Sequence, residues 1–373
     1  MDYGAISLDT SIFDQKGLKL ESGILKTLEQ FNGKPSHLVL SEIVIHEVHA
    51  HLRKKATETR AQVIKAIRES AISLSTTKQN TDTATEALVP KIDDNEVAKD
   101  RITSFVNKTG AEVVPAVGRV ELDDIIKKYF NSEPPFAETG KKKNEFPDAI
   151  ALMSLESWAI ENKTKILAVA KDGDWEKFAE QSEFIDVVGD LAEAISKFQP
   201  HSAAIDYCTN ISRKLPSCEP KDLYESIKQY LTDSVSEIEI FPEASSQFIY
   251  EEDYVEVVLD DFDFITDSEG NALLQPVQGQ NEILIVEAKV YIRATVSASF
   301  SLSARDSIDK DYVSIGSTTV STDLEFESEV LLTFEGDFEA GHDEIDLTDF
   351  ELLSYPADVD FGEIEPDWWH EEQ

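Results

Sequence analysis

The sequence contains only two cysteines, Cys208 and Cys218, among its 373 residues. So few thiols exclude a disulfide framework and a zinc site built on cysteine pairs, and they favour a reducing, cytoplasmic location. No run of 18 apolar residues occurs, so no segment is predicted to span a membrane. The first residues, MDYGAISLDTSIF, also lack the basic and apolar regions of a secretion signal. We therefore expect a cytoplasmic protein that does not bind membranes.

Basic residues are scarce in the second half of the chain. Residues 1–200 carry 26 Lys and Arg against 33 Asp and Glu, whereas residues 201–373 carry 8 against 41. This asymmetry indicates two parts with different roles, and the acidic part would repel nucleic acid. It leaves three interpretations of the acidic part: it keeps the protein soluble, it binds a cationic protein partner, or it makes a self-inhibitory contact by imitating nucleic acid.

Short apolar runs alternate with helical patterns over the first 199 residues, which predicts an α/β domain with a Rossmann-like parallel sheet flanked by helices. The spacing predicts strands at 5–11, 37–41, 165–170 and 184–188. It predicts helices at 20–31, 42–75, 95–109, 118–131, 147–162, 174–181 and 190–198. A helical insertion is expected over about 76–140, and its first part, 76–95, is so polar that it reads as a connector.

The pattern changes in the second half. Residues 200–235 predict a helical linker, with helices at about 201–213 and 220–233. From 236 to 373, apolar and polar residues alternate between turn sequences such as DSEGNA. This alternation predicts an acidic, antiparallel, β-rich accessory domain, for which a sandwich is one arrangement.

Four acids of the first domain come from four separate elements. Asp9 follows the first strand, Asp172 follows the strand KILAVA, Asp148 opens a helix, and Glu47 lies early in the helix after the second strand. In an open α/β sheet, functional residues gather beyond the carboxyl ends of the strands. Carboxylates brought together there repel one another unless cations compensate them, and hard oxygen ligands suit Mg²⁺ or Mn²⁺. A single acid at such a place more often caps a helix, so the prediction depends on the set and its order.

The motifs SLDTSIF, SEIVIHEV, EFPDAIAL and ILAVAKDGDW, in this order over about residues 4–195, resemble those of the PIN domain family of metal-dependent nucleases. The chain looks most similar to bacterial PIN proteins with a long insertion before the third acid. The resemblance implies that one or two Mg²⁺ or Mn²⁺ ions are held by Asp9, Glu47, Asp148 and Asp172, with Asp174 as a fifth acid.

The resemblance also implies that Thr10 and Ser11 support the first acid through their hydroxyl groups. The reaction it implies is hydrolysis of single-stranded or structured RNA by a metal-bound water, leaving a 5′-phosphate. The family often has Asn where this chain has Ser11, and Ser or Thr where it has Ala170. Neither departure removes a carboxylate, but weaker support of the ligands would lower activity.

Two basic clusters flank motif acids in the sequence. Arg53, Lys54 and Lys55 follow Glu47 on the same predicted helix, and Lys141, Lys142 and Lys143 precede EFPDA in a predicted loop. Each cluster alone is typical of a solvated surface. Together they favour contacts with a phosphate backbone.

The stretch SEIVIHEVHAHLRKK holds His46, His49 and His51 close to Glu47. A zinc protease needs histidines at i and i+4, whereas these lie at i, i+3 and i+5, so no zinc is expected. The leading hypothesis is a metal-dependent endoribonuclease, such as a toxin, a phage-defence effector or an RNA-processing factor. The alternatives are a weak or inactive PIN scaffold that acts as a regulatory binding protein through its acidic domain, and a DNA nuclease. The oligomeric state is not predicted.

Overall fold

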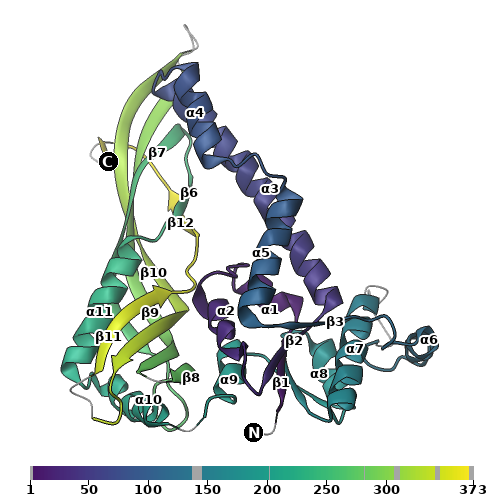
Figure 1. Ribbon diagram of the computed structural model, residues 1–373. Helices are drawn as coiled ribbons and strands as arrows, with labels where there is room; N and C mark the ends of the chain where they lie inside the picture. The colour runs from purple at the N-terminus through teal and green to yellow at the C-terminus, as the bar shows by residue number, and fades with distance from the viewer. Residues whose placement is uncertain are drawn as a thin grey trace. The chain divides into compact units, whose positions relative to one another are not determined.

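A computed structural model describes residues 3–136, 145–200, 202–280, 282–305, 311–340 and 345–368 (Figure 1). The chain divides into two compact units, Met1–Phe198 and Gln199–Gln373. The first is α/β and the second is β-rich, as the sequence predicts. None of the helices within the described ranges combines the length and the apolar character needed to cross a membrane.

The first unit is built on a five-stranded sheet whose strand order is β3-β2-β1-β4-β5. All neighbouring strands pair in parallel. Every residue of β1 and β4 is buried, which explains why these strands read as continuous apolar runs in the sequence. The strands are β1 (Ala5–Leu8), β2 (His37–Ser41), β3 (Glu112–Val114), β4 (Ile166–Val169) and β5 (Ile185–Val188).

Helices cover this sheet and form most of the rest of the first unit (Figure 1). They are α1 (Thr10–Gln15), α2 (Gly23–Thr27), η1 (Leu28–Phe31), α3 (Glu42–Ser73), α4 (Lys78–Leu88), α5 (Asp94–Thr109), α6 (Leu122–Asn131), α7 (Phe146–Asn162), α8 (Gly173–Ala179) and α9 (Leu191–Ser196). The prediction of a connector over 76–95 is wrong at α4, where Thr77 caps the helix by accepting a hydrogen bond from Asn80 N at 3.3 Å. The short edge strand β3 was not predicted.

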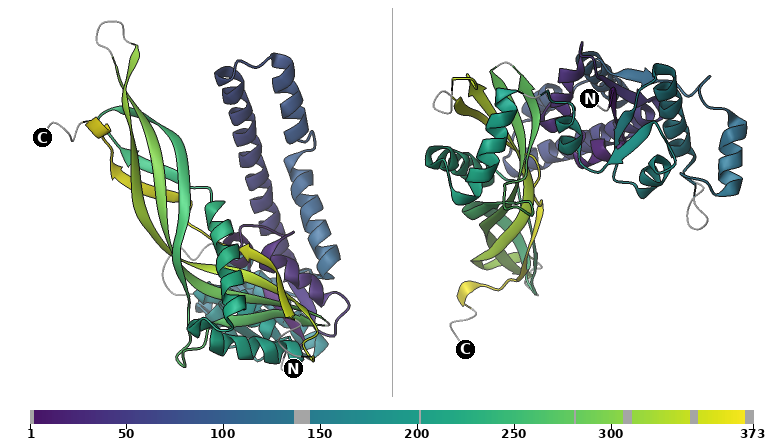
Figure 2. Two further views of the ribbon diagram at one scale, coloured as in Figure 1. Left: turned by 90° about the vertical axis from the view of Figure 1, so that its left-hand side faces the viewer. Right: turned by 90° about the horizontal axis from the view of Figure 1, so that it is seen from below.

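The helix α3 is much longer than its buried part. Only Val44, Val48 and Leu52, all in its first half, are fully buried. Beyond them α3 extends away from the sheet, and α4 and α5 lie alongside it (Figure 2). Ser41 begins α3 by accepting a hydrogen bond from Ile43 N at 3.3 Å, and this fixes the end of the helix that carries Glu47.

The second unit consists of long antiparallel strands with two helices packed against them. The main sheet has the order β11-β10-β9-β7, and β8 also pairs with β9. The strands are β6 (Phe241–Ser245), β7 (Ile249–Phe264), β8 (Leu274–Gln280), β9 (Ile283–Arg305), β10 (Tyr312–Gly336), β11 (Ile345–Leu352) and β12 (Asp358–Glu363). Among the described residues, β6 and β12 form a separate parallel pair.

The segment 200–235, for which the sequence suggested a linker, contributes helices to the core of this second unit. These are α10 (Ala203–Lys214), η3 (Leu215–Ser217) and α11 (Lys221–Ser236). Buried residues such as Ile211 and Leu231 cluster with the even-numbered residues of β9, from Leu284 to Phe300. The main sheet therefore packs against helices, so a sandwich of two large sheets is not formed by the described residues.

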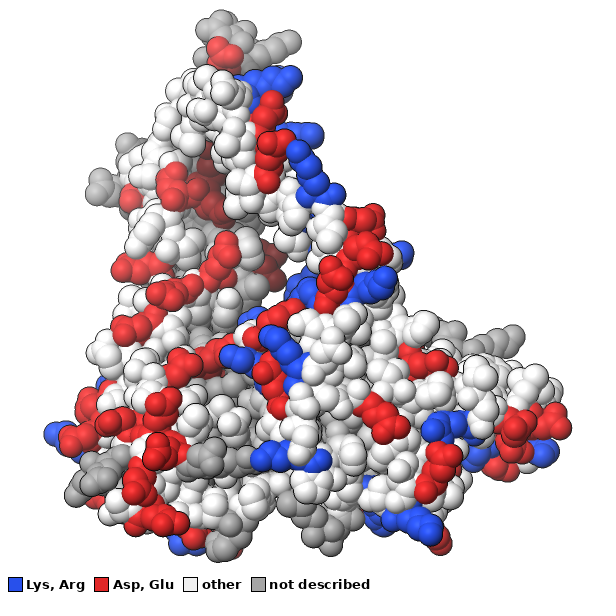
Figure 3. All heavy atoms as spheres, viewed as in Figure 1, with Lys and Arg blue, Asp and Glu red and all other residues white. Residues whose placement is uncertain are grey.

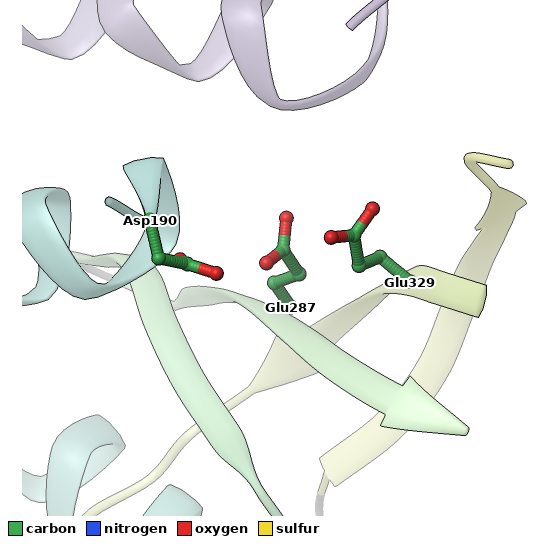
Figure 4. A group of neighbouring side chains, drawn as sticks. All are labelled: Asp190, Glu287 and Glu329. Carbon is green, nitrogen blue, oxygen red and sulfur yellow. The ribbon is translucent and has the colours of Figure 1, made fainter. Parts of the chain in front are cut away.

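The opposite face of the main sheet is polar and acidic. Odd-numbered residues of β9, from Tyr291 to Ser303, point to it, and their partners on β7 and β10 include Glu256 and Glu325. Red acidic side chains over these strands are visible in Figure 3. Glu287 on β9 and Glu329 on β10 also project from neighbouring strands (Figure 4).

Candidate active site at the carboxyl edge of the parallel sheet

Asp9 directly follows β1, and Asp172 lies three residues beyond the end of the neighbouring strand β4. β1 pairs with β4 up to Leu8 and Val169, and Asp9 N continues the pairing by donating to Val169 O at 2.9 Å. Each acid also caps the helix that follows it. Asp9 accepts a hydrogen bond from Ser11 N at 3.2 Å, and Asp172 accepts one from Asp174 N at 2.9 Å. The turn from strand to helix therefore holds both carboxylates at the same edge of the sheet.

The other two predicted acids are positioned by side chains of these same turns. Glu47, on the second turn of α3, accepts a hydrogen bond of 2.6 Å from the Thr10 hydroxyl. Asp148, in the first turn of α7, accepts one of 3.3 Å from the indole N–H of Trp175. Of the two hydroxyl groups expected to support Asp9, that of Ser11 donates to it, whereas that of Thr10 donates to Glu47 and only the backbone of Thr10 bonds to Asp9.

The pKa values of Asp9 and Asp148 reflect their burial and the charges of the neighbouring acids. The pKa of Asp148 is raised from 3.8 to about 6, mainly by burial and in addition by the negative charges of Asp9, Glu47 and Asp172, against the opposing effect of the hydrogen bond from Trp175. Burial also raises the pKa of Asp9, with an added contribution from the charge of Asp172, although hydrogen bonds from Ser11 lower it. All four acids therefore lie in one electrostatic site.

The donor set fits a divalent cation of the hard class. Four carboxylates supply only oxygen ligands, which Mg²⁺ and Mn²⁺ prefer, and partial burial makes their mutual repulsion costly. A cation among them would replace that repulsion with attraction. Asp9, Glu47, Asp148 and Asp172 are the residues that would hold it.

Asp174, the proposed fifth acid, has a cationic neighbour. Its carboxylate accepts a hydrogen bond of 2.8 Å from Lys177 Nζ. The charges of Asp174, Glu145 and Asp172 all raise the pKa of Lys177, so this amino group lies beside the acidic site. The carboxylate of Asp174 can therefore bind a metal cation only if it gives up its ion pair with Lys177 or contacts both at once.

Trp175 and Lys177 were missed by the sequence analysis. Trp175 is fully buried and supplies the hydrogen bond to Asp148, while Lys177 brings a positive charge to the edge of the site. The sequence KDGDWEKF contains a pattern from which the role of Trp175 could have been predicted. An indole on the first turn of a short helix, three residues after a capping acid, faces back towards the residues at the strand ends.

The structure separates the basic cluster on α3 into two parts. Arg53 and Lys54 line a groove of about 500 Å³ between α3 and the start of α5, together with Asp93 and Asn95. Lys55 instead donates a hydrogen bond of 2.6 Å to Gly17 O. The other predicted cluster, Lys141, Lys142 and Lys143, lies outside the described residues.

The histidines of α3 have separate surroundings. His49 Nε2 lies 3.3 Å from Asn95 O, and His51 Nδ1 lies 2.9 Å from the Asp14 carboxylate. These contacts explain both residues as local links between α3 and its neighbours.

A further acid at the sheet edge, Asp190 after β5, caps α9 by accepting a hydrogen bond of 3.0 Å from Glu193 N (Figure 4).

Comparison with known proteins yields one family. Residues 6–175 match the family model described as PIN domain, which covers the carboxylates from Asp9 to Asp174. None of the curated proteins and none of the solved structures matches the chain significantly.

Proposed function

The first unit belongs to the PIN domain family, whose members are typically metal-dependent nucleases, and on this premise we propose that the protein is an endoribonuclease that uses Mg²⁺ or Mn²⁺. The observation that carries the proposal is the convergence of four acids at the carboxyl edge of the parallel sheet, where Asp9 and Asp172 cap the helices that follow β1 and β4, Thr10 holds Glu47, and Trp175 holds Asp148. Burial and the charges of the other three acids raise the pKa of Asp148 to about 6. Such a set is electrostatically unfavourable by itself and favourable around a cation.

Asp9, Glu47, Asp148 and Asp172 would hold one or two ions, with Asp174 as an additional ligand. When bound, a divalent cation lowers the pKa of water and stabilises negative charge that develops on a phosphodiester. The protein's own contribution is orientation. Ser11 and Thr10 fix two of the carboxylates, and Trp175 fixes Asp148 from the side of α8.

We assign contacts with the phosphate backbone of the substrate to basic side chains near the carboxyl edge of the sheet. Arg53 and Lys54 lie on α3 about two turns beyond Glu47 and line a groove of about 500 Å³, which Glu58, Asp93 and Asp94 also line. Lys141, Lys142 and Lys143 are assigned to the same role from their sequence position before Asp148. Lys177 could contact a phosphate if a cation drew Asp174 away from it.

The test is cleavage of a fluorescent single-stranded RNA by the purified full chain with Mn²⁺, Mg²⁺ or EDTA. We expect cleavage with metal and none with EDTA, and we expect Asp9→Asn to lower kcat at least a hundredfold. Asp82→Asn is the matched control, since Asp82 lies on the exposed surface of α4. Equal cleavage by Asp9→Asn would refute the assignment of this site, and a DNA strand of the same sequence would separate ribonuclease from deoxyribonuclease.

A regulatory binding protein is the second candidate, favoured by the acidic face of the second unit. Along β7 and β10 this face carries acidic side chains at Glu251, Asp253, Glu256, Asp261, Asp263, Asp323, Glu325 and Glu327. Its charge suits a cationic protein partner or a contact that competes with nucleic acid. If the chain cuts neither RNA nor DNA but binds a basic protein in a salt-dependent way, this second function replaces the first.

A further inference from the structure

The long strand β10 (Figure 1) has an outer side that is paired over only part of its length. β9 pairs with its inner side almost throughout, whereas β11 pairs with its outer side only over residues 330–336. Near the start of β10, the indole N–H of Trp368 donates a hydrogen bond of 2.6 Å to Ile315 O. Between these two contacts, over residues 319–327, no strand in the described part of the chain pairs with the outer side. Residues 319–327 are therefore an open edge of the main sheet.

The backbone of the open edge offers hydrogen bonds to another strand. Leu353 N donates a hydrogen bond of 2.9 Å to Glu329 O, so the backbone groups of Glu329 point to the outer side. Successive residues of a strand direct their N–H and C=O groups to opposite sides, and no register shift interrupts the pairing of β10 with β9 beyond Gly316. The residues whose backbone groups point outwards are therefore Thr319, Ser321, Asp323, Glu325 and Glu327.

Acidic side chains line one face of the open edge. Asp323, Glu325 and Glu327 are exposed on the polar face of the sheet. Within the described ranges no Lys or Arg forms an ion pair with these three acids, and Arg293 on β9 pairs instead with Asp261 on β7, at 2.8 Å. The three carboxylates are therefore available to cations from outside the sheet.

The other face of the open edge is apolar. Val320, Leu324 and Phe326 are half-buried and pack against the core of the second unit. From the two faces and the outward-pointing backbone groups, we propose that the open edge binds an extended basic segment of another protein as an additional strand. In that segment, Lys or Arg beside the acids alternates with apolar residues beside Val320, Leu324 and Phe326. The proposal specifies the partner of the second candidate function, on which it rests, and it is independent of the nuclease.

The charges of the open edge exclude other occupants. Side chains on the same face of paired strands lie side by side, so pairing with β10 of a second copy brings carboxylates together whether the strands run parallel or antiparallel. A phosphate backbone is repelled by the same charges. A basic segment instead gains opposite-charge pairs across the two strands in addition to the backbone hydrogen bonds.

Fluorescence anisotropy of a short labelled peptide of alternating lysine and valine, titrated with the full chain, tests the proposal. We expect this peptide to bind about tenfold more tightly than one of the same composition whose lysines and valines form separate blocks. A strand pairs with an edge through alternate amides only. N-methylation of one set of amides, those of the lysines or those of the valines, should therefore abolish binding, and N-methylation of the other set should preserve it.

The peptide results separate this proposal from the second candidate function. Equal and salt-dependent binding of the alternating and block peptides would overturn strand pairing and leave a general attraction of the acidic face for cations. Absence of binding, or the same effect from both patterns of N-methylation, would also overturn the proposal.

Substitutions locate the binding on β10. Ser321→Pro removes an outward-pointing N–H without changing the charge, at an edge position that tolerates proline, so affinity should fall about tenfold while Ser321→Ala stays within about twofold. Asp323→Asn with Glu327→Gln should also lower affinity about tenfold. Its matched control is Asp222→Asn with Glu225→Gln, which removes the same charge from the exposed surface of α11.

Circular dichroism verifies that each variant is folded, and the charge variants test the edge even if Ser321→Pro does not fold. A folded edge variant that binds the alternating peptide as tightly as its control would refute the proposal. RNA cleavage is measured on the same preparations and should not change, so a failure of the nuclease assignment is observed separately.

Discussion

Asp148 makes the first unit less stable at neutral pH than it would be with a neutral side chain at this position. Its pKa is raised from 3.8 to about 6 by burial and by the surrounding carboxylates. Folding therefore favours the protonated form of this residue. The resulting stability is fully present below pH 3.8 and is lost as the pH rises through about 6. We predict that Asp148→Asn stabilises the metal-free first unit at pH 8.

The magnitude follows from the two pKa values. The difference between 3.8 and about 6 corresponds to about 3 kcal/mol when Asp148 is fully ionised. Because the side chain is only partly buried, solvent screening reduces this to about 2 kcal/mol. For a unit of this size that free energy raises the unfolding midpoint by about 4–8 °C. Asparagine keeps the oxygen that accepts from Trp175, so the substitution removes the charge and retains the hydrogen bond.

Urea unfolding of the metal-free protein, followed by tryptophan fluorescence, measures this effect. Trp158 and Trp175 are both buried in the first unit, so their emission reports its unfolding. The advantage of Asp148→Asn over the original chain should be about 2 kcal/mol at pH 8 and about half as large at pH 5, where most of Asp148 in the folded protein is protonated. Asp82→Asn, on the exposed surface of α4, should change the free energy of unfolding by less than about 0.5 kcal/mol at either pH.

Addition of Mn²⁺ should make the original chain more stable than Asp148→Asn. A cation that binds the folded site stabilises it in proportion to its affinity, and the original chain has one more charged ligand than the variant. The reasoning is refuted if Asp148→Asn is equally or less stable than the original chain at pH 8 without metal. It is also refuted if the advantage has the same size at pH 5 and pH 8, since a packing effect would not follow the titration of a carboxyl group.

Three further predictions concern the neighbours of the site and the second unit. Thr10→Val removes the hydroxyl that donates to Glu47 at 2.6 Å, so kcat for RNA should fall about 10- to 100-fold while Thr10→Ser stays within a few fold. Arg53→Glu with Lys54→Glu should raise KM and lower the slope of log affinity against log salt by about 2, with little change in kcat, as titrated by RNA binding at several salt concentrations. Phe300→Ala should destabilise the second unit by about 3–5 kcal/mol in calorimetry and leave the unfolding of the first unit unchanged, because Phe300 is fully buried in the core of the second.

The sequence predicted where Asp9 and Asp172 lie in the fold because such positions are set by local rules. A buried parallel strand reads as an apolar run, and the residue after it lies at the sheet edge whatever the rest of the fold does. Asp9 and Asp172 follow β1 and β4, and both cap a helix, which is a favoured role for aspartate. The order of these motifs along the chain then identified the family.

Other features depend on contacts that no local pattern contains. Five of the eleven residues of α4 are threonine, asparagine or aspartate, which are weak helix formers, and its helix forms where it can pack against α3. The three residues of β3 form a strand only because β2 offers them an edge. Likewise, α10 and α11 have the spacing of ordinary amphipathic helices, and their periodicity did not reveal that they cover the sheet of the second unit.

Protein groups satisfy the four carboxylates to different extents. Asp9 and Asp172 accept backbone hydrogen bonds from the helices they cap, and Glu47 accepts from a hydroxyl group at 2.6 Å. Asp148 receives a longer hydrogen bond, 3.3 Å, from a neutral indole, while three negative charges act on it. A bound cation would therefore stabilise Asp148 more than the other acids. Since Asp148 must lose its proton to act as a ligand, metal affinity should fall as the pH drops below about 6. Isothermal titration with Mn²⁺ at pH 7.5 and 5.5 measures this fall, and Asp148→Asn should bind weakly at both values.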